Sequence, residues 1–298
     1  MKTSIILGAN GYIGRHLTHF LIQSGHTVIP ADIQDASVDG VKSYQKLDIT
    51  DIENVTKLDF NVDYVFVFAG LTGTKVGFDQ YQNYLKVNEI GLLNILEHRK
   101  NTGGQAKIIF PSTRLVYKGN KDQRSKETFE KEAKTIYAQN KLACEGYLSM
   151  YANFFDIDYT IYRICVPYGN VFDQNYSYGT IGFFLNRAMK SENITLYGEG
   201  EPKRTFSHVE DICQLIINSI HLPETINEVF NIGSNDNRDL LSVAQQIAKK
   251  YKVGLDFVAW PDIARRLESG DTMFDGSKLQ NLLNYNYKHH INDWIERL

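Results

Sequence analysis

The chain has 298 residues, of which 43% are hydrophobic and 22% charged, a composition typical of a globular protein with one large core or two ordinary ones. Its formal net charge of −3 argues against nucleic-acid and anionic-membrane partners, which favour a basic surface. The three cysteines lack metal-ligand spacing, and no run approaches the roughly 20 apolar residues of a membrane span. We therefore expect a cytoplasmic protein without a metal site.

In the first half of the chain, short apolar runs alternate with helical patterns. We expect strands at 4–7, 26–31, 43–47, 63–69, 107–112 and 158–164. Helices are expected after Gly14, over 83–100 and around Tyr137. The run 63–69 is continuously apolar, as in a strand that is buried on both faces. Strands that alternate with helices predict an α/β fold, a doubly wound parallel sheet covered by helices.

After Pro167 the pattern changes. Residues 170–180 are rich in Asn, Tyr and Gly and predict a loop, and the elements beyond them are shorter. We expect helices near 181–191, 208–220 and 240–251, with strands near 194–198 and 228–234. Residues 1–166 are thus predicted to form the main domain and residues 167–298 a smaller C-terminal lobe that binds substrate. Residues 205–234 are expected to pack back onto the main sheet.

Three glycines, Gly8, Gly11 and Gly14, lie between the first strand and the first helix. A tight turn, a close approach to a pyrophosphate and close contact between helix and sheet each favour a residue without Cβ. The helix N-terminus offers N–H groups to phosphate oxygens. Asp32 ends the second strand, where its carboxylate can accept hydrogen bonds from both adenosine ribose hydroxyls and would repel a 2′-phosphate. These features predict a Rossmann-type domain that binds NAD in preference to NADP.

The spacing Tyr-x-x-x-Lys occurs twice, at Tyr137–Lys141 and at Tyr117–Lys121. On a helix, residues i and i+4 share a face, so a phenol and an ammonium at this spacing can act on one small region. Tyr137 lies in a helical pattern, whereas Tyr117 is followed by a glycine and an asparagine that indicate a loop. The geometry is therefore expected to form only at Tyr137.

Several motifs, in order, resemble one family: the extended short-chain dehydrogenase/reductases, in the branch of nucleotide-sugar epimerases and dehydratases. YAQNK (137–141) resembles the family's Tyr-x-x-x-Lys motif, and STRLVYKG (112–119) resembles its Ser-Ser/Thr-x-x-Val-Tyr-Gly motif. Other landmarks similar to the family's are LDITD (47–51), FAG (68–70), KVNEIG (86–91), LYGEGEPKRTFSHVED (196–211) and GDTMFDGSKLQNLL (270–283). The resemblance covers nearly the whole chain.

The resemblance implies an NAD site. Residues 68–70 are expected under the cofactor's ribose and phosphates, Asp48 and Ile49 at the adenine, and Asn88 as a support of the catalytic layer. The complete expected set of cofactor contacts is Gly8, Gly11, Tyr12, Ile13, Gly14, Asp32, Ile33, Asp48, Ile49, Phe68, Ala69, Gly70, Tyr137 and Lys141.

The resemblance also implies that Thr113, Tyr137 and Lys141 are catalytic and that Tyr117 is structural. A phenol is a poor base at its reference pKa of about 10, but a neighbouring ammonium and a positive nicotinamide both favour the phenolate. Tyr137 is expected to take the sugar's hydroxyl proton, while Lys141 also bonds the nicotinamide ribose. Thr113 would hydrogen-bond the same sugar oxygen. Ser112 is an alternative to Thr113, although strand alternation points it to the other face.

A nucleotide-diphosphate sugar is the expected substrate. The residues implied at it are Thr113, Tyr168, Arg204 and Arg266, with Arg265 as the alternative to Arg266. A planar guanidinium suits diphosphate oxygens. Three positions depart from the family pattern, and they leave the sugar open: Thr72, Lys118 and Val166, the last standing where the family has a substrate-binding Asn.

The residues after Thr113 bear on the reaction. The family's dehydratases carry an Asp-Glu pair there, whereas this chain has Arg114 and Leu115, which cannot perform that acid–base work. We therefore expect an epimerase that oxidises C4 of the sugar transiently and returns the hydride to the opposite face. The alternative is an NAD(P)H-dependent 4-keto-6-deoxysugar-nucleotide reductase, and a third possibility is a catalytically silent NAD-binding regulator.

Two further expectations concern assembly and metals. The family commonly forms homodimers through the helix over 83–100 and the helix of Tyr137. The apolar Leu92, Leu96 and Leu148 permit such a dimer, although core packing explains them equally well. The eight histidines show no ligand pattern and are interpreted as surface or core residues.

Overall fold

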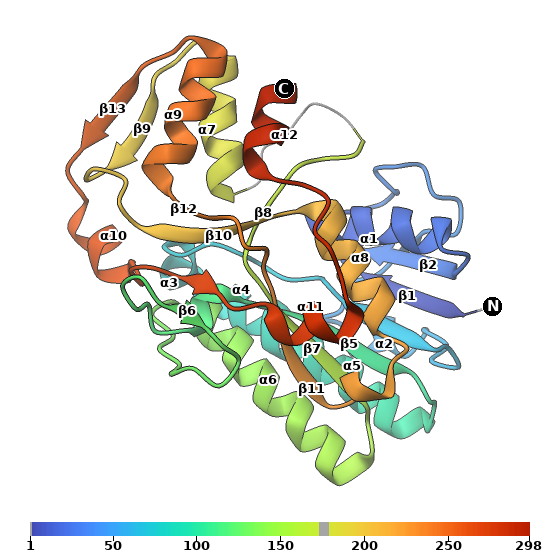
Figure 1. The fold of residues 1–298 in the computed structure, drawn as a ribbon. Coiled ribbons are helices and arrows are strands. Elements are labelled where there is room, and N and C mark those ends of the chain that lie inside the picture. The colour runs from blue at the N-terminus through green and yellow to red at the C-terminus, as the bar shows by residue number, and fades with distance from the viewer. Residues whose placement is uncertain (1, 173–178) are drawn as a thin grey trace. The chain divides into compact units, whose positions relative to one another are not determined.

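The computed structural model describes residues 2–172 and 179–298, and it divides into two compact units (Figure 1). Unit 1 contains residues up to 116, 135–163 and 216–230, and unit 2 contains residues 117–134, 164–215 and 231–298. The boundary after 163 lies close to the predicted one. The segment 117–134 belongs to unit 2, because the hydroxyl of Tyr117 donates to Asn231 and residues 124–125 pair with residues 273–274. Of the segment 205–234, residues 216–230 belong to unit 1.

A seven-stranded sheet, in the order β11-β7-β5-β4-β1-β2-β3, forms the centre of unit 1. Its strands are β1 (Thr3–Leu7), β2 (Thr27–Asp32), β3 (Gln45–Lys46), β4 (Tyr64–Val67), β5 (Lys107–Thr113), β7 (Tyr159–Ile164) and β11 (Glu228–Ile232). β1 pairs in parallel with β2 and β4, β2 with β3, and β4 with β5. The strand order reverses between β1 and β4, and in such sheets ligands bind at the carboxyl ends of the strands beside this switch point. The predicted doubly wound fold is confirmed.

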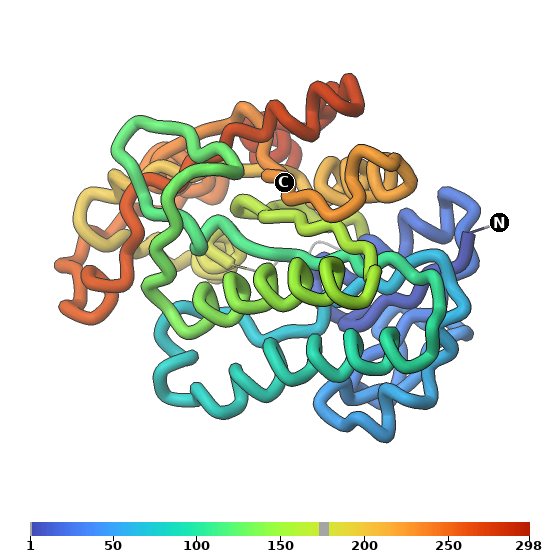
Figure 2. Tube along the Cα trace, turned by 90° about the horizontal axis from the view of Figure 1, so that it is seen from below, coloured from blue at the N-terminus to red at the C-terminus, as the bar shows by residue number. Residues whose placement is uncertain are grey.

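Helices cover this sheet. They are α1 (Tyr12–Gln23), α2 (Ile52–Val55), α3 (Val76–Asp79), α4 (Tyr81–Tyr84), α5 (Gly91–Thr102) and α6 (Ile136–Phe155), together with the short turns η2 (Arg114–Val116) and η3 (Pro223–Thr225). Figure 2 shows α5 and α6 running side by side, and the two helices pack together. They contribute to one core cluster with alternate residues of three strands: Ile5, Leu7, Val65, Val67, Ile108 and Phe110.

Leu92, Leu96 and Leu148 belong to that core and are at most 1% exposed. Core packing is therefore the correct interpretation of these three residues, and they give no argument for a dimer. All four residues of β4 are buried, as its continuous apolar run predicted.

The predicted helix over 83–100 is present, but its winding changes along its length. After α4 the chain makes a π-helical turn, η1 (Leu85–Ile90), before α5 begins. The prediction of a helix over 83–100 is confirmed, since residues 81–102 are helical throughout. The π turn itself was not predicted, because it keeps the helical direction and leaves the apolar pattern almost unchanged. Such turns are frequent at functional sites, since they re-aim a side chain. Here the turn contains the buried Asn88.

Within its described residues, unit 2 contains three small sheets, β12-β10-β8, β13-β9 and β14-β6. Its strands are β6 (Arg124–Ser125), β8 (Val166–Tyr168), β9 (Ile194–Tyr197), β10 (Lys203–His208), β12 (Asn237–Asp239), β13 (Leu255–Val258) and β14 (Met273–Phe274). Its helices are α7 (Gly179–Met189), α9 (Leu240–Tyr251), α10 (Asp262–Leu267), α11 (Ser277–Leu283) and α12 (Ile291–Arg297), and α8 (Val209–Ser219) begins in it. The loop predicted over 170–180 falls partly on residues 173–178, outside the described residues.

The structure also bears on membrane spans and on the cysteines. Among the described residues, no helix combines the length and the hydrophobicity needed to cross a membrane. The cysteines Cys144, Cys165 and Cys213 are free thiols, and all three are buried.

Candidate active site

The glycine turn joins β1 to α1. Gly8 has a φ of +85°, and a Cβ built on it would lie 2.3 Å from the backbone nitrogen of Ala69. A Cβ on Gly14 would lie 2.0 Å from the carbonyl oxygen of Gly8. Gly11 is the N-cap residue of α1 and has no side chain to accept from the first N–H groups of the helix. The turn therefore requires glycine and presents a helix N-terminus that suits a pyrophosphate.

Replacement of Gly14 by alanine tests this close contact. The new methyl group has to displace backbone, so we expect a loss of about 1–3 kcal/mol in the free energy of unfolding, together with weaker NAD binding. Gly146→Ala is the control, because Gly146 is also helical and a Cβ there would meet no atom within 4 Å. That variant should be as stable as the wild type or more so. Urea denaturation and NAD titration of both variants measure the difference, and equal behaviour would contradict the packing argument.

A cavity of about 220 Å³ opens beside the glycine turn. It is lined by nine of the predicted cofactor residues: Gly8, Gly11, Asp32, Ile33, Asp48, Ile49, Phe68, Ala69 and Gly70. These residues lie at or just after the carboxyl ends of β1, β2, β3 and β4, as expected for a site at the switch point. The lining residues that the sequence did not predict include Leu47, which is the first residue of the LDITD motif, Leu71, which follows FAG, and Val87, which lies in the π turn.

Asp32 is fixed at the edge of this cavity. Its Oδ2 atom accepts a hydrogen bond of 3.0 Å from the backbone N–H of Asn10, in the glycine turn. The amide of Asn10 in turn donates to Gln34 and to the carbonyl of Ala36, so the loop after β2 is tied to the same turn. Asp32 lines the cavity, and its role as an acceptor for ribose hydroxyls stays a prediction.

Asp32→Asn should lower NAD affinity by about tenfold and reduce discrimination against NADP, since a charged acceptor is replaced by a neutral one. The amide oxygen can still accept from Asn10, so the turn should persist. Asp35→Asn is the matched control, because Asp35 is an exposed carboxylate of the same loop that pairs with Lys46. Calorimetric titration with NAD and NADP gives the result, and an unchanged ratio of the two affinities in Asp32→Asn would contradict the role of Asp32.

Asn88 connects the cofactor segment to α6. Its Oδ1 atom accepts from the N–H of Leu71 at 2.7 Å, and its Nδ2 atom donates to the carbonyl of Leu71 at 3.0 Å. The same amide lies 3.4 Å from Oδ1 of Asn140, and the thiol of Cys144 donates to the carbonyl of Asn88. The side chain thus holds the chain after Gly70 against the helix of Tyr137.

The three predicted catalytic residues all lie in unit 1. Thr113 ends β5, and Tyr137 and Lys141 lie in the first two turns of α6, which Thr135 caps by accepting from the N–H of residue 138. Nζ of Lys141 lies 6.0 Å from the centre of the Tyr137 ring. A Cβ built on Gly70, which lines the cavity, would lie 4.0 Å from the same Nζ atom. The ammonium therefore lies near both the Tyr137 ring and the cavity residue Gly70.

Burial lowers the pKa of Lys141 to about 8, although the neighbouring Cys144 and Glu145 act to raise it. The ammonium remains mostly protonated at pH 7. Since the folded pKa lies below that of the unfolded chain, the folded state binds fewer protons between about pH 8 and 10.5, and stability rises with pH across that window. Below pH 8 the cost of burying the charge is present in full.

Lys141→Met should therefore stabilise the NAD-free protein at pH 7, by at most about 2–3 kcal/mol. The advantage over the wild type should shrink as the pH approaches 10.5. Urea denaturation at pH 7 and pH 10 measures the difference in free energy of unfolding between the variant and the wild type. Lys57→Met is the control, because Lys57 is exposed, and it should change the free energy of unfolding by less than about 0.5 kcal/mol. A variant that is less stable than the wild type at pH 7 would contradict the burial argument.

One buried ionic cluster joins β5, α6 and β7. Glu145 accepts from the hydroxyl of Ser112 at 2.5 Å and from Nε and Nη2 of Arg163 at 2.9 and 2.5 Å. All three side chains are buried. Ser112 directly precedes Thr113, and Glu145 lies one turn beyond Lys141, so the cluster fixes the catalytic strand end relative to the catalytic helix.

The remaining predicted substrate residues lie in unit 2. Tyr168 is fully buried, and its ring packs on His208 and Trp294. Arg204 is 3% exposed, with Nη2 2.6 Å from Glu268 and Nη1 donating to the carbonyl of Gly270. Arg265 and Arg266 are exposed on α10. Roles for these residues at a diphosphate stay predictions; in the structure, Arg204 organises the turn before β14.

Tyr117 differs from Tyr137 in its surroundings. Its hydroxyl donates to Asn231 at 2.7 Å, and the residue forms an isolated bridge with Lys131 instead of a helix with Lys121. The helical i, i+4 geometry is therefore absent at Tyr117, as predicted.

Comparison with known proteins adds to this geometry. Residues 4–233 match the model of the NAD dependent epimerase/dehydratase family. A UDP-N-acetyl-alpha-D-glucosaminuronate decarboxylase of Bacillus cytotoxicus is 29% identical over 83% of this chain and 79% of its own. A UDP-glucose 4-epimerase of Mycolicibacterium smegmatis is 24% identical over 78% of this chain and 77% of its own.

The fold is shared with solved structures. A UDP-glucuronic acid 4-epimerase from Bacillus cereus, in complex with UDP-glucuronic acid and NAD, superposes with a TM-score of 0.85 at 23% identity, covering 99% of this chain and 96% of that one. The family match confirms the predictions of an enzyme and of NAD as its cofactor, and the superposition confirms the Rossmann-type fold.

Proposed function

Because the chain belongs to the NAD dependent epimerase/dehydratase family, we propose that it is a nucleotide-sugar epimerase that oxidises C4 of the sugar transiently and returns the hydride to the opposite face. The main support is the position of Lys141, whose ammonium lies beside Gly70 at the cofactor cavity and on the same helix as Tyr137. NAD, when bound, accepts a hydride from a carbinol carbon and can give it back.

Side chains of the protein transfer the proton of the C4 hydroxyl. In this proposal, Tyr137 takes the C4 hydroxyl proton and returns it after the 4-keto sugar has rotated. Lys141 is a buried cation on the same face of α6, and it stabilises the phenolate that results. Thr113 ends the adjacent strand, so its hydroxyl can hold the reacting oxygen near the phenol.

The presence of Arg114 and Leu115 in place of an acidic pair supports epimerisation over dehydration. No carboxyl group directly follows Thr113 to protonate the leaving C6 hydroxyl or to remove the proton from C5. The carboxylate of Asp32 favours NAD over NADP, and an epimerase recycles its NAD within each catalytic cycle. The alternative 4-keto-6-deoxysugar-nucleotide reductase would instead consume the reduced cofactor stoichiometrically.

A decarboxylase is the second candidate, since a relative that is 29% identical has that name. Oxidation of a hexuronic acid at C4 places a ketone β to the C6 carboxylate, and such acids lose carbon dioxide readily. The residues proposed for C4 oxidation would serve this reaction unchanged. The two candidates differ only in what the 4-keto sugar does next.

Purified protein incubated with a panel of UDP-hexoses and UDP-hexuronic acids, followed by NMR, tests the proposal. We expect a product inverted at C4, with no net change in absorbance at 340 nm. Carbon dioxide release with a pentose product would favour decarboxylation. Stoichiometric loss of NADH with a 4-keto sugar nucleotide would favour the reductase.

A further inference from the structure

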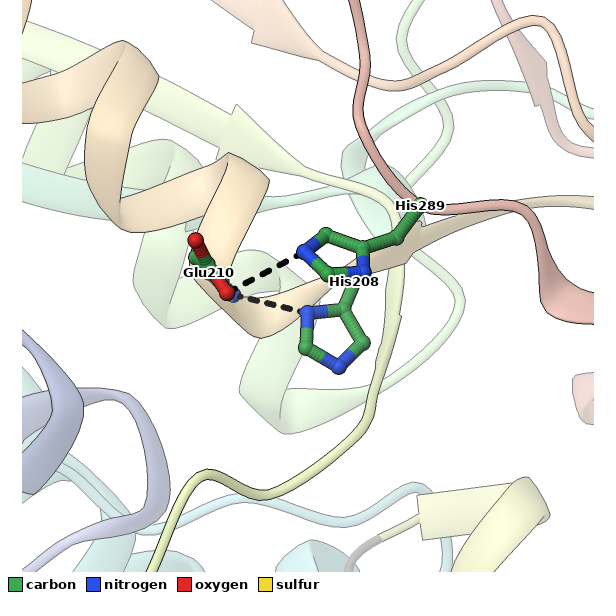
Figure 3. A group of neighbouring side chains, drawn as sticks. All are labelled: His208, Glu210 and His289. Carbon is green, nitrogen blue, oxygen red and sulfur yellow. Dashed lines mark hydrogen bonds and ion pairs between the residues drawn. The ribbon is translucent and has the colours of Figure 1, made fainter. Parts of the chain in front are cut away.

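Two histidines and a glutamate of unit 2 converge, although they come from three segments of the chain (Figure 3). His208 ends β10, Glu210 lies in the first turn of α8, and His289 precedes the N-cap residue of α12. One ligand atom of each residue lies within 4.8 Å of the others. We propose that these three residues bind a divalent transition metal ion of the zinc type.

The three side chains already contact one another. Nε2 of His289 lies 3.1 Å from Oε2 of Glu210, and the two imidazole rings stack with their centroids 4.0 Å apart. Nδ1 of His208 accepts a long hydrogen bond of 3.3 Å from the backbone N–H of Glu210. As an acceptor, a neutral His208 ring carries its proton on Nε2, and the lone pair of Nδ1 points toward Glu210. A metal ion bound at Nδ1 would take the place of this long hydrogen bond.

The fold holds the cluster in place. His208 is 5% exposed, and Glu210 and His289 are half-buried. Asp211 is fully buried and accepts from the backbone N–H of His289 at 3.1 Å, from that of Lys288 at 3.0 Å and from the hydroxyl of Tyr285 at 2.7 Å. The backbone of His289 is thus fixed beside α8, which reduces the conformational entropy that metal binding would otherwise cost.

The donor set selects the kind of metal. Two imidazoles and one carboxylate form a typical set of three protein ligands for zinc, with a fourth position left to water. Magnesium and calcium prefer sets made of oxygen atoms.

Binding requires a small contraction of the cluster. Two atoms that each lie about 2.1 Å from one ion are at most about 4.2 Å apart, so the ligand atoms have to move inward from their present spread of up to 4.8 Å, and the stacked rings have to turn toward the ion. Glu210 and His289 are partly exposed and can rotate, while His208 provides the fixed point. A bound ion would link the end of β10, the start of α8 and the segment before α12, and would stabilise unit 2.

Zinc titration of tag-free, chelator-treated protein tests the site. We expect one ion per chain by calorimetry, an absorption band of tetrahedral Co²⁺ when cobalt is used, and a rise in Tm with zinc but not with magnesium. His289→Gln should weaken zinc binding by at least about tenfold and abolish the rise in Tm. His290→Gln, which changes the exposed neighbouring histidine, should behave as the wild type.

Circular dichroism of the metal-free variants shows whether they are folded, and Glu210→Gln provides a second ligand variant if His289→Gln is not. The proposal is overturned if the wild type shows no saturable zinc binding, or if a folded ligand variant binds zinc as tightly as the wild type. Neither outcome depends on the proposed C4 chemistry.

Discussion

Tyr137→Phe should lower turnover by about 10²-fold or more, with NAD still bound, because removal of the phenol oxygen deletes the group that takes and returns the sugar's proton. The aromatic ring and its packing on α6 persist, and Lys141 keeps its place beside Gly70. Measurement of kcat with the active nucleotide sugar, alongside NAD titration, separates loss of chemistry from loss of cofactor.

Tyr117→Phe is the matched control, since Tyr117 belongs to the second Tyr-x-x-x-Lys pair. Its loss leaves Oδ1 of the buried Asn231 without that donor, so we expect a lower free energy of unfolding, by about 1–3 kcal/mol. The folded Tyr117→Phe enzyme should keep its kcat. Near-normal turnover in Tyr137→Phe would remove the phenol from the mechanism.

Glu145→Gln should reduce the free energy of unfolding by about 3–5 kcal/mol, because it leaves the buried guanidinium of Arg163 without its anionic partner. The ion pair has side chains only 6% and 9% exposed, so water cannot replace the lost charge. Urea denaturation gives the loss directly.

The double variant Glu145→Leu with Arg163→Met is the control for this pair. Replacing both charges with apolar groups of similar size removes the unpaired charge, so much of the stability should return. Turnover of the double variant should be lower than that of the wild type, because the hydrogen bond from Ser112 to Glu145, which links β5 to α6 beside Thr113 and Tyr137, is absent. A single variant as stable as the wild type would contradict the importance of the ion pair.

Much of unit 1 could be predicted, because its determinants are local in the sequence. Strands β1, β2, β4, β5 and β7 coincide with apolar runs in the sequence. The glycine turn contains three glycines at positions where the backbone leaves little or no room for a Cβ. The cavity-lining cofactor residues lie at or just after the carboxyl ends of strands of this sheet. Because the sheet is parallel, the predicted fold brings these residues together at one edge. Asp32 and Gly70 lie in the cavity for this reason.

Other features depend on contacts between distant residues. The π turn at Asn88 keeps the helical direction, so the apolar pattern alone does not reveal it. The segment 117–134 joins unit 2 through Asn231, more than a hundred residues away. His208 and His289 were interpreted as residues without a ligand pattern, because 81 positions separate them in the sequence, and only the fold brings their rings together. Arg204 was assigned from its motif, which does not reveal its ion pair with Glu268.

The fate of a deuterium atom at C4 of the substrate tests the central claim most directly. With a nucleotide sugar deuterated at C4 and the purified enzyme in ordinary water, we predict an inverted product that keeps its deuterium at C4, because the same hydride leaves and returns. Loss of the deuterium to the solvent would contradict the account. Recovery of the substrate with its deuterium in place and no inversion or oxidation at C4 would contradict it as well.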